Sequence, residues 1–309
     1  MNNLGYILSA RTCALKEGND MKRFGNDECW CGSHKKYKKC HEKFDGRLQY
    51  LKKQGYVIPK RAMIKNDKQI EGIRQAAIVN NGLLDYIEEH ICAGMTTQQI
   101  DDMTVEYLNS HDASSADLHY EGYPKSICTS VNDEVCHGIP SDDVILKDGD
   151  IINVDATTCY KGYYADASRM FMIGNVSDEA KQLVAVTREC LYKGIESIQP
   201  FKSTISDIGR AIETHAHQYG YSVVREFCGH GVGLSMHEDP YVLHFDPHCP
   251  TTVLVPGMVI TIEPMINAGE RFIHIGSNDW TAYTDDGSLS AQWEHTLLVT
   301  DTGVEILSM

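Results

Sequence analysis

Apolar residues recur every three or four positions over four stretches of the chain, which is the spacing of helices that bury one face. These stretches are residues 66–94, 96–111, 177–198 and 203–221. Residues that favour helix ends delimit them: Asn66 or Asp67, Gly94, the capping box of Thr96 and Gln99, Ser177 and Gly220. When the sequence is shifted by about 107 residues against itself, the first helix pair aligns with the second. We therefore expect two related α/β halves with little sequence identity.

Five other segments are rich in β-branched residues and are flanked by Gly, Pro or Asp, which predicts strands. They are residues 126–131, 150–157, 163–173, 257–265 and 290–300. Because helices and hairpins alternate, the sequence predicts an α+β chain whose helices cover one face of a curved, largely antiparallel sheet.

Two aspartates interrupt the apolar pattern of one predicted hairpin. Asp155 and Asp166 stand where core strands normally carry hydrophobic side chains. A turn centred between Tyr160 and Lys161 would place them directly opposite one another, with Cβ atoms about 5 Å apart. Two carboxylates at that distance repel each other and raise each other's pKa. A divalent cation would remove the conflict, so we expect a metal between them.

Three further stretches carry ionisable residues on apolar segments. His230 lies between glycines in GHGVG, Glu263 ends the strand VITIE, and Glu294 lies within SAQWEHT. Each buried charge would cost several kcal/mol without compensation. Four carboxylates and one imidazole suit Mn, Fe(II), Co or Zn in a two-metal site. Such a site activates water and stabilises an oxyanion, which is the chemistry of hydrolysis.

Charge is distributed unevenly along the chain, whose net charge is -15. Residues 22–68 hold 14 Lys and Arg against 5 Asp and Glu, whereas residues 69–309 hold 12 against 36. We therefore predict a boundary near Pro59, between a basic segment over 22–59 and a main domain over 60–309. Residues 1–21 are expected to be an unstructured leader.

Bulk properties narrow the cellular location. No stretch approaches 18 apolar residues, which argues against a membrane-spanning helix. Eleven cysteines without a secretory signal favour a reducing compartment, so we expect a cytoplasmic protein.

The basic segment contains the sequence CWCGSHKKYKKCH, whose soft ligands are Cys29, Cys31, Cys40 and His41. Neighbouring lysines would lower the thiol pKa values, and four such ligands complete a tetrahedral structural zinc site. Metal binding would supply most of the folding free energy of so short a segment. The stretch resembles the SEC-C motif, which also implies zinc. Its basic surface favours contact with the ribosome or another anionic partner; a solubilising segment, an incidental lysine-rich loop and a redox Cys-x-Cys pair are the alternatives.

Several sequence blocks carry a resemblance to a known family. INVDAT, YYADASRMF, GHGVG, TIEPM and SAQWEHT, together with GYPKSICTSVNDEVCHGIP, are similar in order and spacing to the signature blocks of type I methionine aminopeptidases. The resemblance covers residues 60–309 and implies the pita-bread fold, with α/β halves related by a pseudo-two-fold axis. It implies a monomeric enzyme that removes the initiator methionine from nascent chains and has no membrane partner.

The resemblance also implies metal ligands. Asp155 would bind one ion, Asp166 and Glu294 would bridge both, and His230 and Glu263 would hold the other. The expected ions are Co, Mn or Fe. Glu263 would in addition shuttle a proton of the bridging water, and the free α-amine of the substrate would replace a water on one metal.

Substrate contacts follow from the same resemblance. His237 would stabilise the scissile amide and the oxyanion, and His137 would contact the peptide near the cleaved bond. The methionine pocket would be lined by Tyr120, Tyr123, Cys128, Met236 and Trp280. This sequence departs from the family pattern twice, because Met236 replaces a frequent phenylalanine and Asp117 replaces a frequent cysteine. Both changes affect the expected pocket shape.

Two other functions compete with this interpretation: a non-catalytic pita-bread protein that binds ribosomes or RNA, and an aminopeptidase acting before proline. The intact ligand set argues against the first, and the GYPKS, NDEVCHGIP and SAQWEHT blocks argue against the second. The segment HFDPHC, which contains His244, Asp246, His248 and Cys249, is interpreted as a polar turn and not as another metal cluster.

Overall fold

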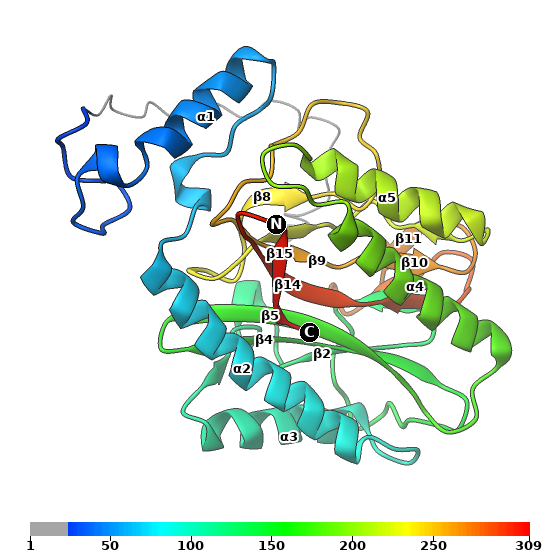
Figure 1. Ribbon diagram of the computed structural model, residues 1–309. Helices are drawn as coiled ribbons and strands as arrows, with labels where there is room; N and C mark the ends of the chain where they lie inside the picture. Colours follow the sequence, from blue (N-terminus) through cyan, green and yellow to red (C-terminus); the bar gives the residue numbers. More distant parts are fainter. Residues whose placement is uncertain (1–23) are drawn as a thin grey trace.

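A nine-stranded sheet forms the centre of the molecule in the computed structural model, which describes residues 24–309 (Figure 1). The leader expected over residues 1–21 lies outside the described residues. The strands run in the order β1-β4-β5-β14-β9-β7-β8, with β2 beside β4 and β15 beside β14, and all of these pairs are antiparallel. Their bounds are β1 Ser114–Ser115, β2 Cys128–Val131, β4 Ile151–Tyr160, β5 Tyr163–Met172, β7 Gly229–Gly231, β8 Glu238–Val242, β9 Val259–Ile262, β14 Glu294–Val299 and β15 Val304–Ser308.

Two three-stranded sheets complete the β structure. One contains β6 (Ser222–Val223), β10 (Met265–Asn267) and β13 (Ser290–Gln292); the other contains β3 (Glu134–Cys136), β11 (Ile273–Ile275) and β12 (Ala282–Thr284). The predicted strands over 257–265 and 290–300 are therefore each split. The first breaks at Glu263 and Pro264, because proline has no N–H to donate to a ladder. The second breaks at Trp293, just before Glu294. Both breaks pass the chain between the central sheet and a small one.

Two helix pairs cover the sheet (Figure 1). They are α2 (Asp67–His90) with α3 (Thr97–Ser110), and α4 (Asp178–Glu196) with α5 (Ile205–Gln218). The first pair buries Leu84, Ile87 and Ile100 in a core with residues of β4 and β5, and the second lies in a separate, larger core that includes residues of β9 and β14. The repeated helix plan expected from the sequence is thus present, and the two pairs contribute to separate cores.

The predicted helix starts are confirmed. Asn66 and Gln69 form a capping box at the start of α2, Thr96 and Gln99 form another before α3, and the Ser177 hydroxyl accepts the Ala180 N–H at α4. The predicted end at Gly94 is wrong, because α2 ends at His90. Ile91 is already extended, and the chain leaves the helix so that Ile91 and Met95 pack against the core beneath α2 and α3.

The segment that precedes α2 packs against the large core of the molecule. It comprises the 3-10 helix η1 (Tyr37–Lys39), α1 (Glu42–Lys53) and the 3-10 helix η2 (Arg61–Met63). Leu48 and Leu51 of α1 join the large core, and the Phe44 ring lies 5.5 Å from that of Phe201. Packing therefore stabilises this segment in addition to any metal. The division near Pro59 stays a prediction.

Candidate metal centre and substrate pocket

The hairpin of β4 and β5 brings the two aspartates together, but not by the predicted pairing. Asp155 lies opposite Ser168, and Asp166 lies opposite Thr157. The two-residue turn is Lys161 and Gly162, which both have positive φ, at 51° and 80°. Type I′ turns require positive φ at both positions, and glycine tolerates it better than Tyr160 would. The register moves accordingly, and the aspartates become diagonal neighbours on the same face.

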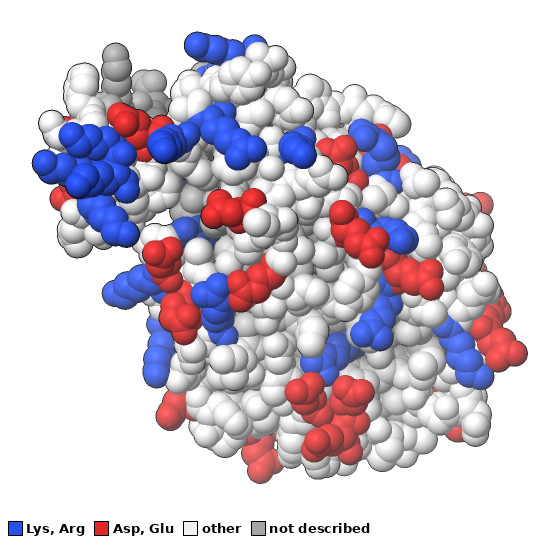
Figure 2. Space-filling model, viewed as in Figure 1, with Lys and Arg blue, Asp and Glu red and all other residues white. Residues whose placement is uncertain are grey.

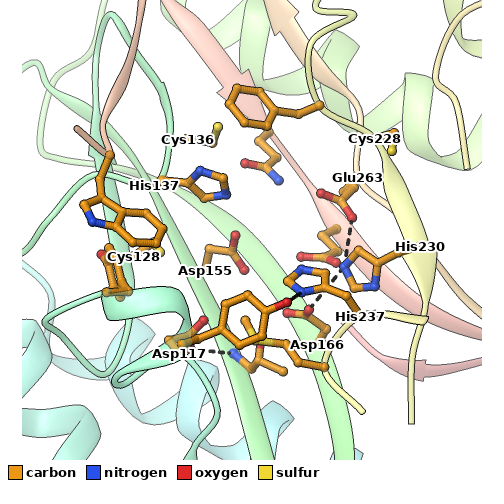
Figure 3. Close-up of a pocket in the computed structure, with 18 of the residues that line it drawn as sticks. Asp117, Cys128, Cys136, His137, Asp155, Asp166, Cys228, His230, His237 and Glu263 are labelled. Atoms are coloured by element: carbon orange, nitrogen blue, oxygen red, sulfur yellow. Dashed lines mark hydrogen bonds and ion pairs between the residues drawn. The ribbon is translucent and has the colours of Figure 1, made fainter. Parts of the chain in front are cut away.

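Side chains from three more positions meet these aspartates, and Figure 3 labels two of them, His230 and Glu263. One ligand atom each of Asp166, His230 and Glu294 falls within 4.8 Å of the others. The Nε2 atom of His230 lies 3.7 Å from Oδ2 of Asp166 and 3.6 Å from Oε1 of Glu263. Asp155, Asp166 and Glu263 project into one cavity with Glu294. The five predicted metal ligands therefore converge.

The orientation of His230 favours a cation at this position. Its Nδ1 lies 3.0 Å from the carbonyl oxygen of Gly231, which can only accept, so we assign the ring proton to Nδ1. Its Nε2 then presents a lone pair to the carboxylates of Asp166 and Glu263. A nitrogen lone pair that faces two carboxylate oxygens is repelled by them. A cation placed between the imidazole and the two carboxylates would instead attract all three groups.

Because these carboxylates are buried, their ionised forms are energetically costly unless a metal ion is bound. Burial raises the pKa of Asp155 to about 7 and that of Glu263 to about 8, and raises the pKa values of Asp166 and Glu294 well above normal, with added repulsion from neighbouring carboxylates. Oδ1 of Asp166 and Oε1 of Glu294 are buried and have no hydrogen-bond partner among residues 24–309. The donor set, four carboxylates and a neutral imidazole, fits two divalent cations.

Two further imidazoles face this centre. Nδ1 of His237 lies 2.8 Å from the Tyr120 hydroxyl, and its ring centroid lies 4.3 Å from that of His230. His137 has positive φ, and its ring packs edge-on against Phe227. Burial lowers the pKa of His237 to about 3 and that of His137 to about 4. Both rings are consequently neutral near pH 7 and can donate a hydrogen bond.

The predicted substrate residues line the same cavity: Tyr120, Tyr123, Cys128, Met236 and Trp280. The rings of Tyr123 and Trp280 meet edge-on at 5.0 Å, and the Tyr123 hydroxyl donates to backbone carbonyls of Ile127 and Gly138. Sequence reasoning missed further lining residues, which add mostly apolar or sulfur-containing surface: Cys136, Phe227, Cys228 and Met265. Cys136 and Met265 lie within the NDEVCHGIP and TIEPM blocks, but an apolar or sulfur-containing residue there is also typical of an ordinary core position.

Asp117 forms a polar part of the cavity wall. Its Oδ2 accepts the Thr157 N–H at 3.1 Å, so the side chain is fixed to β4 two residues beyond Asp155. Burial, followed by repulsion from Asp155, raises the pKa of Asp117 well above its normal value. The substitution noted in the sequence thus lies beside both the pocket and the metal ligands.

Two buried residues behind the ligands were also missed. The Thr261 hydroxyl accepts the backbone N–H of His230 at 2.9 Å and donates to Oε1 of Glu263 at 2.7 Å. Nε2 of His244 accepts the Glu263 N–H at 3.1 Å. The interpretation of HFDPHC as a polar turn is therefore wrong for His244, which is fully buried. It holds for Asp246, which pairs with Arg210, and for His248, which is exposed.

The second predicted site is also assembled. Ligand atoms of the four residues Cys29, Cys31, Cys40 and His41 lie within 4.8 Å of one another. Nδ1 of His41 is 3.2 Å from the sulfurs of both Cys29 and Cys40. The expectation that lysines lower the thiol pKa values fails at Cys29, because burial dominates and raises its pKa to about 11. This cluster could hold a zinc ion.

Comparisons with known proteins agree with this geometry. Residues 71–301 match metallopeptidase family M24, and residues 26–43 match the SEC-C motif. A methionine aminopeptidase of Chlamydia pneumoniae is 42% identical over 94% of this chain and 99% of its own length. One of Escherichia coli K12 is 44% identical over 80% of this chain and 93% of its own.

Solved structures give the same result. The crystal structure of a methionine aminopeptidase from Rickettsia prowazekii superposes with a TM-score of 0.77 and 42% identity, covering 82% of this chain and all of that one. A prolidase from Pyrococcus furiosus, at 23% identity and a TM-score of 0.62, shares the fold alone and covers 80% of this chain and 65% of its own. The expected pita-bread fold is confirmed. The chain therefore belongs to metallopeptidase family M24, whose members act with divalent metal ions.

Proposed function

We propose that this enzyme is a methionine aminopeptidase, which removes the initiator methionine from nascent chains by hydrolysing the first peptide bond. One observation carries the proposal: a cluster of buried carboxylates and a lone-pair-presenting imidazole opens into a cavity lined by aromatic and sulfur-containing side chains. Apolar, polarisable surface of this kind suits the thioether of methionine. The curated relatives named above carry the same activity in their names.

We assign Asp155 to one metal, Asp166 and Glu294 to both, and His230 and Glu263 to the other. The position of Asp166 supports its shared role, because it lies beside Asp155 on the hairpin and beside His230 across the sheet. When bound, the two ions would activate a water molecule at neutral pH and stabilise negative charge on the substrate carbonyl. The oxygen-rich ligand set favours Co, Mn or Fe over structural zinc.

Protein side chains would carry out the remaining steps. Oε1 of Glu263 is held by Thr261, so Oε2 is assigned the proton taken from water and passed to the leaving amine. A hydrogen bond from the Tyr120 hydroxyl to Nδ1 of His237 would leave the ring proton on Nε2, where it can stabilise the oxyanion. His137 is assigned to the peptide near the cleaved bond. All of these groups come from one chain, so the proposed mechanism needs no residue from a second subunit.

The N-terminal segment is proposed to bind a structural zinc through Cys29, Cys31, Cys40 and His41, and to contact the ribosome. Figure 2 shows Lys and Arg gathered over η1 and α1, whereas both signs of charge mix over the rest of that face. A basic surface is suited to an RNA phosphate backbone. Residues 22–59 would then act as a docking segment for the catalytic domain over 60–309.

Location follows from the substrate. Because nascent chains carry their initiator methionine where they are synthesised, the proposal includes a cytoplasmic location. Within residues 24–309, no helix has the length and apolar character that crossing a membrane requires.

Peptide hydrolysis tests the activity. The purified protein should release methionine from Met-Gly and Met-Ala peptides when Co or Mn is added, and should leave Ala-Pro peptides intact. The proline-specific alternative is not favoured, because the solved structures of X-Pro peptidases and prolidases are only 21–24% identical to this chain. An absence of methionine release from metal-loaded protein would overturn the proposal in favour of a binding function.

A further inference from the structure

A buried ion pair joins the segment before α2 to the loop that carries Met236 and His237. Nζ of Lys65 lies 2.6 Å from Oε2 of Glu238. The exposed fraction of the Lys65 side chain is 1% and that of Glu238 is 16%. A lysine buried to this degree needs a charged partner, and either charge would be costly to leave without the other.

Glu238 also organises the backbone of this loop. Its Oε1 accepts the N–H of Leu234 at 2.7 Å and that of Ser235 at 3.2 Å. These two hydrogen bonds close the backbone of residues 234–238 into a tight loop. Met236 and His237 lie within this loop, between Ser235 and Glu238. Directly after His237, Glu238 begins β8 and pairs with Gly231, the neighbour of His230.

Lys65 is itself fixed to the strand that leads to Glu263. Its backbone N–H donates to the carbonyl of Gly257 at 2.8 Å, and Ile64 forms an antiparallel bridge with Met258, just before β9. Lys65 thus connects two separate parts of the proposed active site. One is β9, which leads to Glu263, and the other is the loop ahead of β8, which contains Met236 and His237.

We propose that Lys65 and Glu238, here termed the clamp, position His237 over the reacting bond and Met236 in the wall of the methionine pocket. This inference rests on the proposed aminopeptidase function. Neither clamp residue lines the cavity, so both would act through the loop and not on the substrate. A displacement of about 1 Å in a positioned group can lower a rate by about 100-fold.

The chain offers a matched control. Lys60 lies five positions earlier in the same linker and pairs with Asp239 at 2.6 Å, one residue after Glu238. Both of these side chains are about two-fifths exposed, at 41% and 42%. Lys60→Met removes an exposed ion pair to the same segment, and Lys65→Met removes the buried one with the same change of side chain.

The experiment compares methionine release from Met-Ala peptides by the wild type and these variants, each loaded with Mn and checked for bound metal. Lys65→Met should lower kcat by about 10-fold to 100-fold and raise KM, with metal content unchanged, whereas Lys60→Met should match the wild type. Glu238→Gln added to Lys65→Met should restore part of the activity. The amide oxygen still accepts the Leu234 and Ser235 N–H groups, and the buried charge is removed.

A double-mutant cycle separates positioning from general destabilisation. In a His237→Ala background, Lys65→Met should cause little further loss of kcat, because the group that it positions is absent. An undiminished loss in that background would overturn the inference, as would wild-type kinetics in Lys65→Met. If Lys65→Met does not fold, the comparison is made with Lys65→Met/Glu238→Gln alone, which must show a lower kcat than Lys60→Met. Inactive wild-type protein would instead refute the proposed function and remove the basis of the clamp.

Discussion

The Thr261 hydroxyl joins two proposed ligands of the same metal, and its removal should weaken metal binding. It accepts the His230 N–H and donates to the Glu263 carboxylate, and it is fully buried. Thr261→Val keeps the volume of the side chain but deletes both hydrogen bonds. The His230 N–H would be left buried without an acceptor, at a cost of about 1–3 kcal/mol in the free energy of unfolding.

The expected loss of metal-binding free energy is of the same order as the loss of stability. Loss of a residue that orients metal ligands typically lowers metal affinity by about 10-fold to 100-fold, or about 1.4–2.8 kcal/mol. Titration of metal-free protein with Mn, followed by calorimetry, measures this affinity. Peptide turnover as a function of Mn concentration should show the same shift, and saturating Mn should recover much of the activity.

Thr187→Val is the matched control. Thr187 is equally buried in α4, its hydroxyl donates to the Leu183 carbonyl, and neither residue lines the cavity that holds the ligands. This variant should lose about 1 kcal/mol of stability at most and keep wild-type metal affinity. Equal Mn affinities in Thr261→Val and the wild type would show that the hydroxyl does not organise the ligands.

Three other outcomes are expected. Asp166→Asn should lower kcat/KM by at least about 1,000-fold and reduce the metal content toward one ion per chain, as measured by elemental analysis; full activity would contradict its shared role. Burial raises the pKa values of Asp155 and Glu263 above their unfolded values, so the stability of metal-free protein should be greatest at low pH and fall as pH rises from about 4 to about 8. Thermal melts in a chelator should show this fall and saturating Mn should reduce it, whereas a melting temperature that rises over this range in chelator would refute the assignment. Cys40→Ser should abolish zinc retention and lower the melting temperature while leaving Met-Ala turnover at saturating Mn close to wild type; retained zinc would exclude Cys40 as a ligand.

The sequence alone determined the features that are encoded locally. Helix starts at Asn66 and Thr96 could be read directly, because a capping box needs only residues three apart. The metal ligands could be found because a charge on an apolar strand is costly, and that cost is visible wherever Asp155, Asp166 or Glu294 interrupts a hydrophobic run. Family resemblance then supplied their roles.

Only the tertiary structure decided what depends on distant parts of the chain. The hairpin register was set by the conformation available to Lys161 and Gly162, so Asp155 and Asp166 became diagonal neighbours instead of opposite ones. The contact between Lys65 and Glu238 spans 173 positions, and neither residue has an unusual local sequence. Such partners are chosen by how strands and loops pack, because burial and charge compensation are properties of the folded environment and not of the residue.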